Sequence, residues 1–338
     1  MLFQSPVSGG KRMIAILKPN ALHPDRFDRQ ALVATDAIPD GAVWLDLLQP
    51  TLDEEHAVEN YLGIDVPTRE EMRDIEPSNI LYVEDGASFM SARILCGSES
   101  ELPTLAPVSF ILKGGKLATI RYEEPRSFDL FASRLARPGA CGGSGEQVLA
   151  AMMETIIDRA AEILRLIGER IDSVTTEVFD TKRKTGPRDF RMTLNLLAQE
   201  GDRISKVRES MVSIERMLLF FSTRVDTIKG LGSLKNELKT TLRDVQSLED
   251  HATFLNDKIQ FLLDAILGLV SLDQNNIVKI FSVAAVVFMP PTLIASIYGM
   301  NFNIMPELQW AIGYPFAIGL MACSALFTYL FFRWKKWL

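Results

Sequence analysis

The chain has 338 residues, of which 47% are hydrophobic and 23% are charged, and its formal net charge at pH 7 is −7. This acidic balance gives no reason to expect a nucleic-acid partner, and the apolar excess lies in about the last sixty residues, so most of the chain is expected to be soluble. The cysteines Cys96, Cys141 and Cys323 are widely spaced and follow no paired or metal-ligand spacing, so no disulfide framework is implied and a reducing compartment is expected.

The first part of the chain, residues 1–145, alternates short β-rich runs with helix signals. Thr-x-x-Glu patterns at 51–54 and 68–71 predict two helix starts. Asp-Gly at 85–86 and Gly-Gly at 114–115 each separate two strand-like runs, which predicts hairpins. These patterns predict a cytosolic α/β domain with a mixed sheet. The candidate strands are 13–17, 42–47, 80–84, 87–95, 107–112 and 116–121.

Helices are predicted for almost all of the remaining chain. Residues 146–233 have the pattern of an antiparallel helical hairpin. A third helix is predicted over 234–298, where the only helix breakers are Gly268 and the pair Pro290 and Pro291. At 1.5 Å per residue this stalk helix would extend about 95 Å. The two prolines favour either a gating hinge or a static kink.

Two apolar stretches near the C-terminal end are long enough to cross a membrane. Residues 280–306 and 308–332 contain no Asp, Glu, Lys or Arg, and a hydrocarbon core needs about 20 apolar residues. We therefore predict a multi-pass α+β membrane protein. Its expected segments are a first span at about 277–298, a loop at 299–309, a second span at 310–332 and a basic tail at 333–338.

Basic residues flank the two spans unevenly. Lys279 precedes most of the first span and the tail after the second span is basic, whereas the loop between them carries only Glu307. By the positive-inside rule, both termini should face the cytoplasm. The start of the chain lacks the apolar segment of a secretory signal, so we expect the soluble part to remain cytosolic and the protein to lie in the cytoplasmic (inner) membrane.

One face of the stalk helix keeps the same character for about seven heptads. In a parallel coiled coil this face would carry Leu, Ile and Val, but here most of its residues are small, polar or acidic. We call this face the polar seam. Its members are Asp250, Phe254, Asp257, Phe261, Asp264, Gly268, Ser271, Asn275, Val278, Ser282, Ala285, Met289, Thr292, Ser296 and Gly299.

The polar seam has two interpretations. Small residues permit close helix packing in membranes, which would make the seam a dry contact. The seam also carries three aspartates, including Asp257 and Asp264, and then Asn275 where the membrane begins. Aspartates at a packed homomeric contact would repel one another, whereas around a water-filled axis they attract cations. The sequence therefore favours an oligomeric pore with an acidic cytosolic funnel.

The spanning residues also limit the chemistry of transport. They include no carboxylate, and a dehydrated divalent cation needs charged oxygen ligands, so a hydrated ion such as Mg²⁺ is expected. We find no phosphate-binding G-x-x-x-x-G-K-[ST] loop, so nucleotide is not expected as a partner and the membrane potential would drive the ion. No nucleophile–base pair or metal-ligand cluster suggests an enzyme.

The run FMPPTLIASIYGMNFNIMPELQWAIGYP, the two C-terminal spans and the KKWL ending resemble the CorA magnesium-transporter family. The resemblance is specific over about residues 275–338 and extends as an architecture over the rest of the chain. It implies a homopentamer in the lipid bilayer, with a cytosolic funnel, a stalk helix that continues into the pore-lining first span, and an outer second span. It also implies transport of Mg²⁺, with Co²⁺ and often Ni²⁺ as further substrates.

The resemblance assigns roles to residues of the pore. The family's Gly-Met-Asn selectivity motif falls on Gly299, Met300 and Asn301, and Asn301 is expected to contact the waters of the incoming ion. Glu307 would attract cations to the external mouth, although it could also be an ordinary solvated loop residue. The family's pore-lining positions fall on Asn275, Met289, Thr292 and Ser296, and the seam adds Val278, Ser282 and Ala285.

The resemblance also implies regulation by cytosolic Mg²⁺, which binds between subunits and favours the closed state. Glu84 and Asp85 match the family's Glu-Asp pair, although Asp-Gly is also a turn signal. Two stalk partners are open: Asp244 resembles the family's aspartate but lies one helical turn too close to Asn275, and Asp250 is the competing choice.

Two alternatives remain at this point. A Zn²⁺ transporter of the same fold would differ from this chain at Met300 and in the MPEL loop. A membrane-anchored coiled-coil scaffold would carry no ion flux, and replacement of Asn301 by Ala would then leave its function intact.

Overall fold

The computed structural model describes residues 14–19, 27–32, 37–74, 76–97, 103–135, 142–180, 190–228, 230–301, 306, 310 and 312–335. The chain divides into two compact units. The first unit comprises residues 1–180 and 191–261, and the second comprises residues 181–190 and 262–338.

A seven-stranded mixed sheet forms the centre of the first unit, with the order β2-β1-β3-β7-β6-β5-β4. The neighbours β3 and β7 are parallel, and all other neighbouring strands are antiparallel. The predicted mixed sheet is confirmed, but the sequence did not predict β2. The strands are β1 (Ile14–Pro19), β2 (Phe27–Leu32), β3 (Trp44–Leu48), β4 (Leu81–Glu84), β5 (Ala87–Cys96), β6 (Thr104–Lys113) and β7 (Lys116–Arg121).

Both predicted hairpins are present. Asp85 and Gly86, between β4 and β5, have φ angles of 47° and 75°. Gly114 and Gly115, between β6 and β7, have φ angles of 58° and 75°. Positive φ at both central residues is the type I′ turn, whose twist matches that of the flanking strands.

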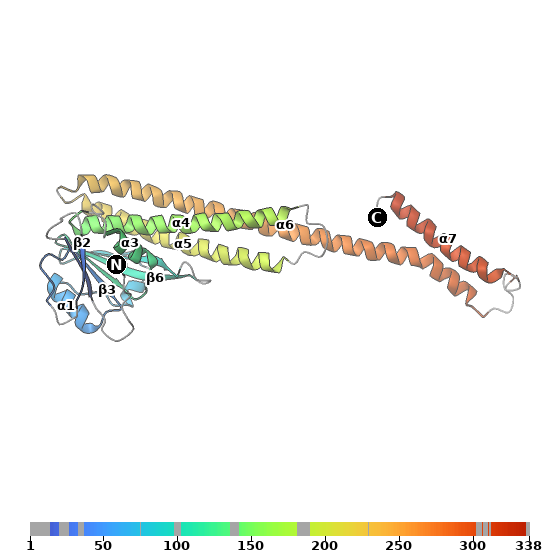
Figure 1. Ribbon diagram of the computed structural model, residues 1–338, viewed down its shortest axis with the longest axis horizontal. Helices are drawn as coiled ribbons and strands as arrows, with labels where there is room; N and C mark the ends of the chain where they lie inside the picture. Colours follow the sequence, from blue (N-terminus) through green and yellow to red (C-terminus); the bar gives the residue numbers. More distant parts are fainter. Residues whose placement is uncertain are drawn as a thin grey trace, which may run out of the picture. The chain divides into compact units, whose positions relative to one another are not determined.

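Helices accompany the sheet in the first unit. They are α1 (Leu52–Leu62), the 3-10 helix η1 (Glu71–Arg73), α2 (Pro77–Ile80), α3 (Arg126–Leu135), α4 (Gly145–Phe179), α5 (Arg191–Val225) and the first part of α6 (Gly232–Tyr298). Helix α3 was not predicted from the sequence. Figure 1 shows the long helices α4 and α5 beside the sheet, and α5 makes its most extensive contacts with β5.

The two predicted capping patterns have different outcomes. At α1 the capping box is complete, because Thr51 N donates to Glu54 Oε2 at 2.8 Å and Glu54 N donates to Thr51 Oγ1 at 3.4 Å. Thr68 and Glu71 make the same reciprocal bonds, at 2.8 and 3.3 Å. Only the three residues of η1 follow them, so the prediction of a full helix there is wrong in extent.

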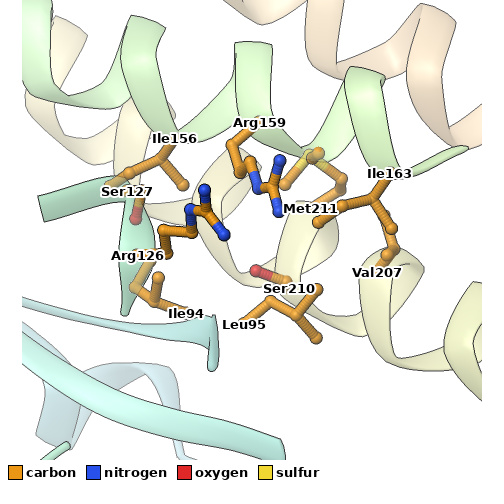
Figure 2. Close-up of a pocket in the computed structure, with 11 residues that line it drawn as sticks. Ile94, Leu95, Arg126, Ser127, Ile156, Arg159, Ile163, Val207, Ser210 and Met211 are labelled. Atoms are coloured by element: carbon orange, nitrogen blue, oxygen red, sulfur yellow. The ribbon is translucent and has the colours of Figure 1, made fainter. Parts of the chain in front are cut away.

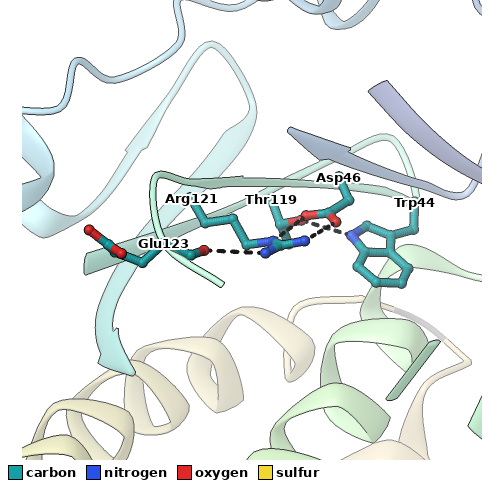
Figure 3. A network of polar contacts seen from close by, with 5 residues as sticks. All are labelled: Trp44, Asp46, Thr119, Arg121 and Glu123. Carbon is teal, nitrogen blue, oxygen red and sulfur yellow. Dashed lines mark hydrogen bonds and ion pairs between the residues drawn. The ribbon is translucent and has the colours of Figure 1, made fainter. Parts of the chain in front are cut away.

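A buried polar network fixes the centre of the sheet (Figure 3). Arg121 donates to Asp46 from Nε at 3.0 Å and from Nη2 at 2.8 Å, and these residues are only 5% and 4% exposed. Thr119 donates its hydroxyl to Asp46 at 2.8 Å and accepts from Trp44 Nε1 at 2.9 Å. Arg121 Nη1 also donates to the carbonyl of Glu123 at 3.2 Å. Because each guanidinium nitrogen has an acceptor, the charged pair is tolerated inside the core.

A small cavity of about 20 Å³ lies where β5 meets α3, α4 and α5. Figure 2 shows the side chains of Arg126 and Arg159 at this cavity, with Ile163 and Met211 among its apolar walls. A space of this size holds about one water molecule. The cavity is therefore a packing defect of the helical layer and too small for an organic ligand.

The first part of α6 packs against α4 and α5. Phe261 stacks on Phe179 of α4, with ring centroids 6.2 Å apart. Lys258 forms an ion pair with Asp172 of α4, and Gln246 Nε2 donates to Glu215 Oε1 of α5 at 2.9 Å. These contacts, together with a row of buried apolar residues, fix the rotation of α6 about its own axis.

Candidate functional site

Helix α6 runs from Gly232 to Tyr298 without interruption over 67 residues, which corresponds to about 100 Å at 1.5 Å per residue. Pro290 and Pro291 lie inside this helix. They supply no backbone N–H to the preceding turn, so two carbonyl groups there lose their usual donors. The second unit contains the rest of α6 and the helix α7 (Gly313–Trp334), which is drawn in red in Figure 1.

Within the first unit, α6 has two opposite faces. Ala252 is 1% exposed, whereas Asp250 is exposed. Two residues correspond to about 200° around a helix, so these two side chains point in nearly opposite directions. The face that carries Asp250 is the polar seam predicted from the sequence. The buried apolar residues of the other face are Leu234, Leu238, Val245, Ala252, Leu255 and Ile259.

Every member of the polar seam is exposed in the single chain. In the first unit this includes the acidic positions Asp250 and Asp257, and in the second unit it continues through Asn275 to Gly299. Phe254 and Phe261 on the same face are 59% and 60% exposed, and Phe261, at the border of this face, also stacks on Phe179 of α4. Large apolar side chains exposed beside charged residues on one continuous face indicate a surface that meets another molecule.

Two hydroxyl groups of the seam, those of Ser282 and Thr292, have a common geometry in the spanning part. Ser282 donates to the carbonyl of Val278 at 2.8 Å, and Thr292 donates to the carbonyl of Phe288 at 2.7 Å. Because each hydroxyl hydrogen is bonded to the helix, the oxygen lone pairs remain to accept from groups outside the helix. At these two positions the exposed side of α6 therefore presents acceptors rather than donors.

The Gly-Met-Asn motif lies directly after the last turn of α6. Gly299 N donates to the carbonyl of Ala295 at 2.9 Å and Met300 N donates to that of Ile297 at 3.3 Å, while Asn301 is exposed. A Cβ atom added to Gly299 would lie 3.1 Å from the Ala295 oxygen, which is a close approach for any larger residue. The carbonyl end of a helix carries partial negative charge, so this position favours cations.

Glu307, which was expected at the external mouth, lies outside the described residues. The loop is described only in part. Among the residues near it, Trp310 and Phe316 make an edge contact with ring centroids 6.0 Å apart, and Tyr314 is exposed. At the other end of α7, Trp334 is also exposed. Aromatic residues at both ends of an apolar helix are typical of a helix that reaches both membrane–water interfaces.

The four acidic residues expected in regulation lie on two elements of the first unit. Glu84 ends β4 and Asp85 begins the adjoining turn, while Asp244 and Asp250 lie on α6, and all four are exposed. In the described part of the chain, no group of three or more His, Cys, Asp or Glu side chains is arranged to hold a metal ion. Within one chain, these residues do not form a metal site.

The structure adds an acidic neighbour of Asp244 that the sequence did not indicate. The pKa of Asp158 is raised above its usual value, mainly by burial and then by the negative charges of Glu154 and Asp244, while Arg134 opposes this effect. Asp158 and Glu154 belong to α4. Asp158 of α4 therefore lies close enough to Asp244 of α6 for their charges to interact, and only the packing of these two helices reveals it.

The fold defines a helical membrane protein with two candidate spans and a large α/β domain. The two spans are the end of α6 and the helix α7, whose most apolar windows have mean hydropathies of 2.1 and 1.8. A family model described as "CorA-like Mg2+ transporter protein" matches residues 39–336. The chain belongs to this family. Its members are ion transporters and not enzymes, as the sequence suggested.

Curated relatives match almost the whole chain. The protein named "Magnesium transport protein CorA" from Pasteurella multocida is 34% identical over 304 residues, which cover 90% of this chain and 94% of that protein. The protein of the same name from Haemophilus influenzae (strain KW20 / Rd) is 35% identical over 299 residues, covering 88% and 92%. The Escherichia coli protein of the same name is 34% identical, with the same coverage.

Solved structures share the fold at low sequence identity. The CorA magnesium transporter from Methanocaldococcus jannaschii has a TM-score of 0.70 at 17% identity and covers 98% of this chain and 100% of its own. The cytoplasmic domain of ZntB from Vibrio parahaemolyticus has a TM-score of 0.58 at 12% identity and covers 78% of this chain and 99% of its own. At these identities the similarity concerns the fold alone.

Proposed function

We propose that this protein is a gated, channel-like importer of hydrated Mg²⁺ in the cytoplasmic membrane, with Co²⁺ as a further substrate. The relatives named as magnesium transport proteins support the choice of ion, because they match about nine tenths of the chain. The observation that carries the proposal is the polar seam, which is exposed along α6 on the side opposite its packed face.

The path for the ion would form between copies of this chain. A single α6 helix exposes a polar face but encloses nothing, so several copies must surround a common axis. The expected assembly is a homopentamer with both termini in the cytosol. Asp257 and Asp264 would then form acidic rings that raise the local concentration of cations. Asn275 would follow at the start of the spanning part.

The chemistry of the spanning face suits an ion that keeps its water. A hydrated Mg²⁺ presents water hydrogens outward, and it releases these waters reluctantly. The hydroxyl oxygens of Ser282 and Thr292 can accept from those waters, because their own hydrogens are bonded to carbonyl groups of the helix. Asn301, at the negative end of α6, would make the first contact with the incoming ion, and Glu307 would attract ions to the mouth.

The energy for influx would come from the membrane potential. A charge that crosses 100 mV gains about 2.3 kcal/mol, so a divalent cation gains about twice that amount. Such a passive path needs a gate. We propose that cytosolic Mg²⁺ closes it by binding between Glu84 and Asp85 of one copy and Asp244 or Asp250 of the next. The interaction between Asp158 and Asp244 supports this, since a bound cation would relieve their repulsion.

Replacement of Asn301 by Ala tests the proposal. The full-length protein is reconstituted in liposomes, and Mg²⁺ and Zn²⁺ uptake are measured with fluorescent indicators under an imposed potential. The variant should lose at least about tenfold of its Mg²⁺ flux, which corresponds to about 1.4 kcal/mol, while its size by light scattering stays unchanged. Asn276→Ala is the matched control, because Asn276 lies one residue off the polar seam.

Three results would contradict the proposal. If Asn301→Ala keeps the full Mg²⁺ flux, the Gly-Met-Asn motif is not part of the ion path. Uptake of Zn²⁺ without Mg²⁺ by the unmodified protein would favour a Zn²⁺ transporter of the same fold. An intact assembly that carries no cation at all would favour a scaffold.

A further inference from the structure

A second and larger cavity in the first unit has no part in the proposed ion path. It is an open pocket of about 390 Å³ beside β6, which lies within the range of about 300–1,000 Å³ that is usual for sites of small organic molecules. Three of its lining residues are arginines, Arg69, Arg73 and Arg93, and Glu123 is the only carboxylate among the lining residues that the structure describes.

Arg93 is held on β5 by contacts with α5. Its backbone N–H donates to Ser213 Oγ at 2.9 Å, and its carbonyl accepts from Ser210 Oγ at 2.7 Å. Its guanidinium forms an ion pair with Glu209, and the Arg93 side chain is still 38% exposed. The backbone of Arg93 is therefore fixed in position, and its side chain remains partly open to solvent.

Arg69 and Arg73 approach the same pocket from the segment around η1, which packs on β6. The Arg69 guanidinium lies 5.0 Å from the centre of the Tyr122 ring. Tyr122 in turn donates its hydroxyl to Glu55 Oε1 at 3.4 Å. An arginine stacked on an anchored ring is preorganised for a partner that binds at its edge. Arg73 is exposed at the end of η1.

The charge of this pocket is opposite to that of the whole chain. The chain has a net charge of −7, yet three arginines and one glutamate line the pocket. Arginine keeps its charge at all physiological pH values, and its planar donors fit the oxygens of a phosphate group. The remaining wall includes the apolar residues Leu105 and Pro107, which can cover an uncharged part of a ligand.

We propose that this pocket binds a phosphorylated small molecule of about the size of a nucleotide, held by arginine side chains and not by the phosphate-binding loop that the sequence lacks. The phosphate group would lie among the three guanidinium groups, and the body of the ligand would lie along the β6 side of the pocket. Because Arg93 also pairs with Glu209 of α5, the bound phosphate would compete with that carboxylate. Binding in the pocket would thus weaken a contact between β5 and α5.

Calorimetric titration of the full-length protein in detergent tests this proposal. The probes are AMP, inorganic phosphate and adenosine, and EDTA is present so that no divalent cation contributes. AMP should bind more tightly than inorganic phosphate, and adenosine should bind least. Arg73→Gln should weaken AMP binding by about tenfold or more, since a hydrogen bond to a charged group contributes about 1.5–3 kcal/mol. The matched control is Arg165→Gln, because Arg165 pairs with Glu169 on the exposed face of α4 and does not line the pocket.

Several outcomes would overturn the proposal. Absence of AMP binding at millimolar concentration would do so, as would equal losses in Arg73→Gln and Arg165→Gln. Equal affinities for AMP and inorganic phosphate would refute a ligand with an organic body. If circular dichroism shows that the Arg73→Gln variant is not folded, the Arg69→Gln variant is titrated in its place. The assay measures no flux, so its result is independent of the proposed transport function.

Discussion

The hydroxyl group of Thr292 offers a direct test of the proposed ion path. Thr292→Val keeps the size and branching of the side chain and removes the hydroxyl oxygen. The lost bond to the carbonyl of Phe288, 2.7 Å long, is local, so α6 should still form. What disappears is one acceptor for the waters of the ion in each copy. A net hydrogen bond contributes about 0.5–1.5 kcal/mol, which corresponds to a factor of about 2 to 12 in rate per copy.

If several copies contact the ion at once, these factors multiply, and the Mg²⁺ flux of Thr292→Val should fall by about tenfold or more. The matched control is Thr328→Val on α7, because Thr328 makes the same kind of bond, to the carbonyl of Ser324 at 2.9 Å. Flux is measured in liposomes under an imposed potential, with equal amounts of assembled protein. A wild-type rate in Thr292→Val, or equal losses in both variants, would refute the reasoning.

Two further predictions concern acidic residues of the first unit. The double change Glu84→Gln and Asp85→Asn should raise flux at millimolar internal Mg²⁺, and an unchanged dose response would remove both residues from the gate. The pKa of Asp158 is raised, mainly through burial. The folded state therefore holds the carboxyl proton of Asp158 more tightly than the unfolded state does. As a result, the stability of the fold decreases as the pH rises above the usual pKa of 3.8. Asp158→Asn should therefore raise the thermal midpoint at pH 7 and lose this advantage as the pH falls toward 3.8; the opposite trend would show that the carboxylate is stabilised by its partners.

The parts of the fold that carry a periodic or turn signal could be predicted, and the others could not. The hairpins at 85–86 and 114–115 are set by local φ angles that Asp-Gly and Gly-Gly adopt readily. Strand β2 reads FDRQAL, which has no alternation of apolar and polar residues, and it pairs on one side only because it is an edge strand. Its pairing with β1 is set by the rest of the sheet.

The segment 68–71 shows a different limit of sequence reasoning. The reciprocal bonds between Thr68 and Glu71 form as predicted, but a capping box only starts a helix. The chain then turns after Arg73, and Pro77 follows shortly. Because a proline disfavours helical backbone at the residue before it, the segment has too little room for a longer helix.

The candidate site was open to prediction to the extent that it lies on one helix. The positions of the polar seam follow from the helical period alone, and the opposite apolar row, which includes Leu255 and Ile259, confirms the phase of that period in the first unit. The interaction of Asp158 with Asp244 could not be found in this way. Asp158 lies more than eighty residues earlier in the chain than Asp244, and only tertiary packing brings their charges close.

The ion pair of Asp46 and Arg121 restricts how the central sheet can change during evolution. Loss of either partner would leave the other as an isolated charge in the core, at a cost of about 3–5 kcal/mol, which is a large share of the stability of an ordinary domain. A substitution at one of these two positions would therefore destabilise the protein unless the other position changes with it. The positions of Asp46 and Arg121, which lie on the neighbouring parallel strands β3 and β7, should accordingly covary.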